Sequence, residues 1–229
     1  MDLEQRKLWN ANHKRLTDQI LKPAEHVNTL KLFMDQHAML YSSKLQDSQE
    51  LITLEDVLMK DIKEETLRQY PVKTQDTKNS IVWHLWHITR IEDMTMNVLA
   101  SNNEQIFYSG AWDKQLNIDC VHSGNGMSEA EIAELSTNID VSALLSYRLQ
   151  VGRRTREIIG SMPPEQFKQK VDPVQIKALE DQGAVKKEEK WLLEYWGNKS
   201  IAGLVLMPAT RHNYVHLNKS LRIKHKYQK

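Results

Sequence analysis

Two histidines near the end of the sequence, one helical turn apart, carry the clearest chemistry. His212 and His216 lie in the segment Arg211-His-Asn-Tyr-Val-His216. On a helix they stand about 40° from each other, in the middle of an apolar face where a soluble helix normally buries Leu or Val. Neutral imidazoles at such positions form a pair of nitrogen ligands for a metal ion. The alternative is that both are core histidines that bond to local groups.

The segment 83–87, Trp-His-Leu-Trp-His, offers the third nitrogen ligand. It lies in an apolar stretch from Ile81 to Ala100, which we expect to be a helix capped by Ser80. His84 and His87 are only about 60° apart on that helix, so both fall within its buried arc. The periodicity leaves the choice between them open and places His84 nearer the centre. Three neutral histidines would leave a metal ion its full charge and at least one open coordination position.

The spacing His212-x-x-x-His216 also occurs in zinc peptidases. There a glutamate directly follows the first histidine and serves as the general base. Asn213 occupies that position and cannot accept a proton, so we exclude a peptidase.

Other titratable residues are expected to be bystanders. Glu92 and Asp93 could be hydrogen-bond partners of His87 or a base, but solvent-facing carboxylates are the simpler expectation, because Asp93 points away from the buried arc. Cys120 is a lone cysteine without a paired base, which is typical of an inert thiol. Three further histidines stand singly in the N-terminal helices and are expected to be surface or packing residues: His13, His26 and His37.

The composition is that of a soluble globular protein of 229 residues, with 40% hydrophobic and 27% charged residues. Lys and Arg total 31 and Asp and Glu 30, a net charge of +1, so there is no positive field to attract nucleic acid. A single cysteine excludes an internal disulfide and fits a reducing, cytoplasmic setting. We find no apolar run of membrane-spanning length and no signal peptide at the charged N-terminus.

The pattern of the whole chain predicts one all-α domain over residues 1–229. Residues 1–65 are rich in helix formers, and capping boxes at Thr53 and Ser128 begin two further helices. Thr53 to Arg68 and Val141 to Ser161 are expected to be helical, while residues 163–190 are polar and mixed and 191–196 form a short amphipathic piece. Pro208 should kink the last helix. The simplest architecture is a four-helix bundle with extra N-terminal helices and long connecting segments.

The longest of these connections, Ser101–Gly126, has no clear period. Connections of this length in a compact domain are usually lids or insertions with a function, although an irregular loop pinned by its aromatic residues is the alternative. We expect Trp112 to lie near the mouth of the metal pocket, since the connection follows the helix of His87.

The chain resembles the DinB-like superfamily of small helical metalloenzymes, also called the DinB/YfiT-like fold. The matching stretches are residues 79–93 and 210–218, together with Tyr147-Arg148 in the intervening helix. The resemblance covers most of residues 25–225 and leaves 1–24 as an N-terminal helical extension. It implies a four-helix bundle, often a homodimer, in which three histidines bind a divalent metal such as zinc or nickel.

The resemblance also selects the ligands. The first ligand of the family directly precedes a hydrophobic residue, which matches His87-Ile88 and favours His87 over His84. The other two ligands map to His212 and His216. Studied relatives are transferases or isomerases that use bacillithiol, mycothiol or glutathione. Their common ending His-x-x-x-His-x-Gly-Gln is replaced here by Leu217-Asn-Lys219 after the last histidine, so the sequence does not specify the thiol.

These observations lead to one expected function and two alternatives. We expect a metal-dependent transferase that conjugates a small thiol to an electrophilic small-molecule substrate. The first alternative is a hydrolase that uses a metal-activated water. The second is a non-catalytic, stress-related metal-binding protein, which a fourth protein ligand such as His84 would favour.

Overall fold

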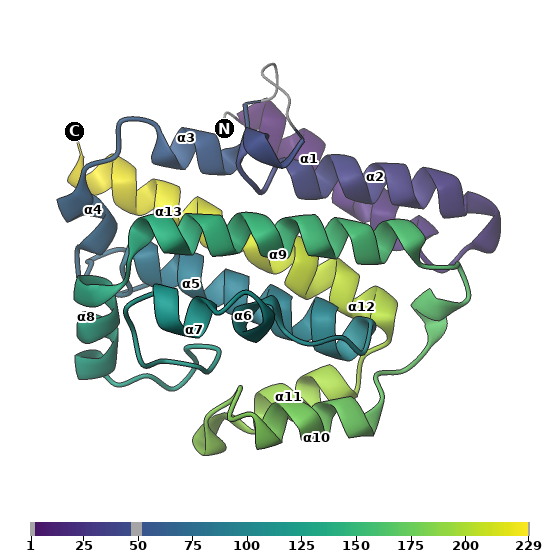
Figure 1. Ribbon diagram of the computed structural model, residues 1–229. Helices are drawn as coiled ribbons and strands as arrows, with labels where there is room; N and C mark the ends of the chain where they lie inside the picture. Colours follow the sequence, from purple (N-terminus) through teal and green to yellow (C-terminus); the bar gives the residue numbers. More distant parts are fainter. Residues whose placement is uncertain (1–2, 47–51, 229) are drawn as a thin grey trace.

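The computed structural model describes residues 3–46 and 52–228, which are built from helices (Figure 1). Within these ranges the β pairing consists of two isolated bridges, Thr74–Thr77 and Lys170–Ser200, so the predicted all-α class is confirmed. None of the described helices has the length and apolar character needed to cross a membrane. The α-helices are α1 (Leu3–Gln19), α2 (His26–Ala38), α3 (Leu54–Met59), α4 (Glu64–Arg68), α5 (Ile81–Glu92), α6 (Ile106–Ser109), α7 (Trp112–Gln115), α8 (Glu129–Asn138), α9 (Val141–Ser161), α10 (Pro173–Asp181), α11 (Trp191–Gly197), α12 (Ile201–Leu206) and α13 (Asn213–Tyr227).

Helix α5 is the centre of the fold. Ser80 begins it by accepting a hydrogen bond from the backbone N–H of Trp83 at 3.1 Å, as predicted. All twelve of its residues are buried, because α4, α8, α9 and α13 pack around it. The sequence predicted a helix with one buried face and one exposed face, so the prediction of an exposed face was wrong. The helix continues as a π-helical segment, Asp93–Ala100, which gives it the predicted extent.

The C-terminal helix is also interrupted by π-helical geometry. Ser200 caps α12 by accepting from the backbone N–H of Gly203. The segment Met207–His212 is π-helical, and α13 follows it directly. Pro208 has no N–H to donate to the preceding turn, and wider turns accommodate this loss without ending the helix. The helix changes type at the position where the kink was predicted, and the π-helical segment ends at His212.

The capping signals in the sequence correctly located the starts of two helices, but they gave no sign that one expected helix is divided in two. The capping boxes at Thr53 and Ser128 are present, and α9 spans the predicted residues. The expected helix from Thr53 to Arg68 is instead two helices, α3 and α4. Asp61 lies between them in the left-handed region at φ 52°, a conformation that Asp tolerates better than most residues.

Helices α10 and α11 form a hairpin beside the other helices, at the lower edge of Figure 1. The amphipathic piece at 191–196 was predicted and is α11, whereas α10 lies in a region that showed no helical pattern. Asp172 caps α10 and Pro173 occupies its first turn, which is the usual arrangement for both residue types. The hairpin packs against the π-helical segment that follows α5, and it supplies one wall of the site described next.

Candidate metal centre

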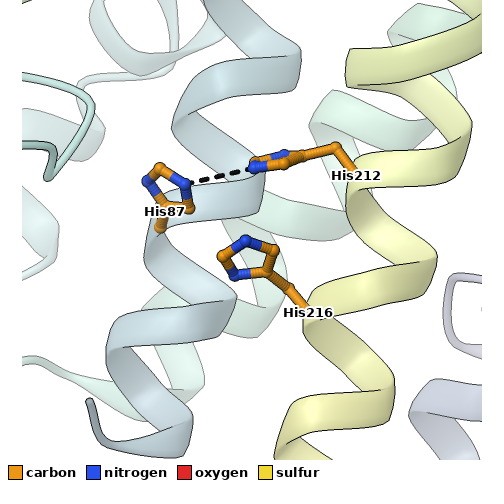
Figure 2. A group of neighbouring side chains, drawn as sticks. All are labelled: His87, His212 and His216. Carbon is orange, nitrogen blue, oxygen red and sulfur yellow. Dashed lines mark hydrogen bonds between the residues drawn. The ribbon is translucent and has the colours of Figure 1, made fainter. Parts of the chain in front are cut away.

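Three histidines from two helical segments converge at the middle of the fold (Figure 2). His87 comes from α5, His212 from the end of the π-helical segment, and His216 from the first turns of α13. One ring nitrogen of each lies within 4.8 Å of the others, and Nε2 of His87 is 3.2 Å from Nε2 of His212. Among the His, Cys, Asp and Glu side chains of the described residues, these three are the ones that lie close enough together to hold a metal ion.

This donor set fits a divalent transition metal. An ion bound tetrahedrally at about 2.0–2.1 Å from each nitrogen separates the nitrogens by about 3.4 Å. The 3.2 Å between Nε2 of His87 and Nε2 of His212 is close to that value. The remaining separations, to the ring nitrogen of His216, are at most 4.8 Å. Imidazole nitrogens are suitable ligands for both zinc and nickel.

The ring of His87 is held by two contacts. Its Nδ1–H donates to the backbone carbonyl of Ser123 at 2.6 Å. A carbonyl can only accept, so Nδ1 carries the hydrogen and Nε2 keeps its lone pair toward His212. The indole of Trp83 stacks on the same imidazole, with centroids 4.7 Å apart and planes inclined by 12°. The protein therefore presents His87 in the tautomer and orientation that a metal ligand needs.

His84 is a hydrogen-bonding neighbour of His216 and lies outside the cluster of three. Nδ1 of His84 is 2.9 Å from Nδ1 of His216, and Nε2 of His84 is 3.0 Å from Oγ1 of Thr77. When Nε2–H of His84 donates to Thr77, its Nδ1 accepts from Nδ1–H of His216. This order of donors leaves the lone pair of His216 on Nε2, where it is available to a metal ion.

All four histidines are held in the neutral form that ligates metals. Burial lowers the pKa of His87 to about 4, and the hydrogen bond to Ser123, which by itself would raise the pKa, offsets only part of this effect. Burial also lowers the pKa of His84, His212 and His216 well below the usual value, and the neighbouring imidazoles add to the effect. At neutral pH a metal ion therefore does not have to displace protons from these side chains.

The carboxylates of Glu92, the last residue of α5, and of Asp93, the first of the π-helical segment that follows, do not face solvent, so that expectation was wrong. Glu92 and Asp93 are both fully buried, because helices surround α5 on every side. Glu92 accepts from Nε2 of His37 at 2.9 Å; burial alone would raise its pKa, but His37 holds the pKa of Glu92 below its usual value. Asp93 accepts from the hydroxyl of Tyr147 at 2.6 Å, and burial raises its pKa. Both carboxylates are committed to these partners and are not placed to serve the metal centre as a base.

Asn213 joins a buried polar network that the sequence did not reveal. Its Nδ2 donates to Glu92 at 2.7 Å and to the carbonyl of Pro208 at 3.0 Å. Its Oδ1 accepts from Arg148, whose Nε donates to Glu55 at 2.6 Å. The amide thus secures the π-helical turn before His212 instead of facing the ligands. The signal in the sequence was the occurrence of Asn and Arg on otherwise apolar helix faces.

The remaining candidate residues are partners in packing, and only one of them is fully buried. His13 bonds to the carbonyl of Leu206 at 3.0 Å, and His26 packs near Phe167. His37 is fully buried against Glu92, which makes it part of the internal network and not a surface residue. Burial raises the pKa of Cys120 to about 11, in line with an inert thiol, but its sulfur lies 3.6 Å from Nε2 of His122, so the expectation that no base accompanies it was wrong.

The long connection 101–126 reaches the site, but through different residues than expected. Trp112 donates to Gln150 at 3.3 Å on α9 and is not among the residues that line the pocket at the histidines, so the prediction for Trp112 was wrong. The later part of the connection supplies Ser123, which bonds to His87, and Asn125, which lines the pocket. The pocket has a volume of about 190 Å³ and opens beside His87 and His212.

No protein-family model and no curated protein sequence matches the chain. The family resemblance therefore rests on the sequence motifs named above: residues 79–93, Tyr147-Arg148 and residues 210–218. Function is inferred below from the geometry of the three-histidine centre and of the pocket beside it.

Proposed function

We propose that this chain is a metal-dependent transferase that conjugates a small thiol to an electrophilic substrate. The observation that carries the proposal is the convergence of His87, His212 and His216 beside a pocket of substrate size. Zinc or nickel is the proposed ion. Packing between α2, α9, α5 and the α12–α13 segment supports a four-helix bundle of the DinB-like type, with α1 as the added helix. The homodimer implied by the resemblance is part of the same proposal.

The residues of the chain prepare the centre for this reaction. A divalent ion held by three neutral imidazoles supplies Lewis acidity and lowers the pKa of a thiol that binds to it. Ser123 and Trp83 orient His87, and His84 orients His216, and one ring nitrogen of each of the three ligands lies within 4.8 Å of the others. In the transfer, the thiol sulfur forms a bond to the electrophilic carbon. The leaving group departs with its bonding electron pair, and the thiol proton passes to solvent.

The surroundings of the centre support a thiol more than a water as the nucleophile. None of the described residues that line the pocket is acidic, and Glu92 and Asp93 are engaged by His37 and Tyr147. A thiol with a pKa near 8.5 loses its proton readily at a metal ion, whereas water starts from about 15.7 and gains more from a general base. The hydrolase is therefore the second candidate.

The open pocket also argues against a purely structural metal. His84 bonds to His216 and does not complete a fourth coordination position, while the pocket begins at His87 and His212. Structural zinc sites are usually closed by four protein ligands, whereas catalytic sites keep one position open.

Metal content and thiol conjugation test the proposal together. After chelation and reloading, the wild-type chain should bind about one zinc or nickel ion, and Ala at any of His87, His212 or His216 should remove most of it. His225→Ala, at an exposed position of α13, is the matched control and should keep the metal. The loaded wild type should then accelerate conjugation of glutathione or cysteine to 1-chloro-2,4-dinitrobenzene.

Two results would contradict the proposal. A wild-type chain that binds neither ion has no metal centre. A loaded chain that conjugates none of the thiols but cleaves 4-nitrophenyl acetate would be assigned to the hydrolase instead.

A further inference from the structure

The pocket beside the metal centre has an aromatic wall supplied by α11. Trp191, Tyr195 and Trp196 all line it. Trp191 and Tyr195 are four residues apart and share one face of the helix, and Trp196 directly follows Tyr195. Trp196 is buried, but Trp191 is 52% exposed and Tyr195 is 37% exposed, although both are large rings. Single exposed apolar residues are common, but two partly exposed rings over one cavity indicate a ligand surface.

The opposite wall is apolar as well. It is lined by Ile91 from α5 and by Met207 and Pro208 from the π-helical segment Met207–His212. His87 and His212 close one end, so a molecule in the pocket would contact the two imidazoles that face each other at the proposed metal centre. The pocket thus has an apolar body and a reactive end.

Two charged side chains beside α11 contact its aromatic rings. Glu189 accepts a hydrogen bond from the indole N–H of Trp191. The ammonium of Lys199 lies 4.2 Å from the centre of the Tyr195 ring. Among the described residues, those that line the pocket carry no charged side chain at neutral pH; their polar groups are the two imidazoles, the Asn125 amide, the Tyr195 hydroxyl and the indole N–H groups. A charged group inside the pocket would lose its hydration without gaining an ion-pair partner.

We infer that the pocket binds the electrophilic substrate, and that this substrate is an uncharged molecule with one aromatic ring. A dry cavity of about 150 Å³ is known to accommodate benzene, so 190 Å³ holds a ring with a small substituent. The ring stacks between α11 and Pro208, and the reactive carbon lies at the end formed by His87 and His212. This inference rests on the proposed function, since it is the metal centre that makes that end reactive.

The pocket can be tested without metal chemistry by using three unreactive probes of the same size. These are 4-nitrobenzyl alcohol, which is neutral, 4-nitrobenzoate, an anion, and 4-nitrobenzylamine, a cation at pH 7. Binding to the chelated chain is measured by equilibrium dialysis, so that no probe can ligate a metal. The neutral probe should bind with one site per chain and about tenfold or more tighter than either charged probe.

Two variants assign the binding to this pocket. Tyr195→Ala should weaken the neutral probe by about fivefold to tenfold through loss of one ring face, and Met207→Trp should abolish binding by filling the cavity. Tyr227→Ala is the matched control, because Tyr227 has the same exposed fraction of 37% but lies at the end of α13, away from the pocket. Circular dichroism checks that all three variants are folded.

The outcomes separate this inference from the proposed function. Equal binding of neutral and charged probes, or binding that survives both pocket variants, would overturn the inference even if the chain binds metal and conjugates thiols. Probe binding as expected in a chain that takes up no metal would support the pocket and overturn the proposed function.

Discussion

Acidifying the metal-free chain from pH 7 to pH 5 should lower its free energy of unfolding, and His87 should account for a defined part of the loss. Burial lowers the pKa of folded His87 to about 4, whereas a histidine in an unfolded chain titrates near 6.5. Between these values the unfolded state binds the proton and the folded state does not. The stability is therefore highest above about pH 6.5 and declines as the pH falls towards about 4.

The magnitude follows from the two pKa values. At pH 5 the unfolded side chain is almost fully protonated, while about a tenth of folded His87 carries a proton. At about 1.36 kcal/mol for each pKa unit, the loss between pH 7 and pH 5 is about 2 kcal/mol from His87 alone. His84, His212 and His216 also have lowered pKa values, so the total loss for the wild type should be larger.

Urea unfolding with chelator present, at pH 5, 7 and 8, measures this loss. His87→Asn is the informative variant, because the amide can still donate to the carbonyl of Ser123 but does not titrate. Its stability difference between pH 7 and pH 5 should be about 2 kcal/mol smaller than that of the wild type. Between pH 7 and pH 8 the two proteins should behave alike. An identical pH dependence from 7 to 5 would refute the assignment of a neutral, buried His87.

Three further changes test the contacts around the centre. His84→Ala should weaken zinc affinity about 10–100-fold in a competition titration without changing the stoichiometry, because His84 orients a ligand and does not bind the ion. Arg148→Met leaves Glu55 buried without its partner and should cost about 3–5 kcal/mol in urea unfolding, and a loss below about 1 kcal/mol would contradict the buried pair. Gly152→Ala should cost about 1–3 kcal/mol, since its Cβ would lie 2.6 Å from the Tyr41 ring; an unchanged midpoint would contradict that contact.

Several features could be predicted from the sequence because they depend on neighbours along the chain. The bounds of α9 and the caps at Ser80, Thr53 and Ser128 follow from local propensity and side-chain-to-backbone bonds within a few residues. The i,i+4 spacing of His212 and His216 places them on one face of any helix, so their proximity was predictable as well.

The arrangement around those histidines was decided by packing between distant segments. Periodicity did not decide whether His84 or His87 is the metal ligand. Their roles differ because residues distant in the sequence bond to their ring nitrogens: Ser123 bonds to His87, and His216 bonds to His84. Glu92 was expected to face solvent and is buried, because exposure depends on how many helices surround α5.

The pocket shows the same division. Its aromatic wall on α11 was visible in the sequence as a short amphipathic piece, with no indication of what that piece would cover. Only the packing of the α10–α11 hairpin against the π-helical segment Asp93–Ala100 brings those rings to His87 and His212. Residue types and spacing along the chain determine which helices form and which ligands they carry. The tertiary structure decides which of these side chains meet, because burial and hydrogen-bond pairing are properties of contacts between segments distant in sequence.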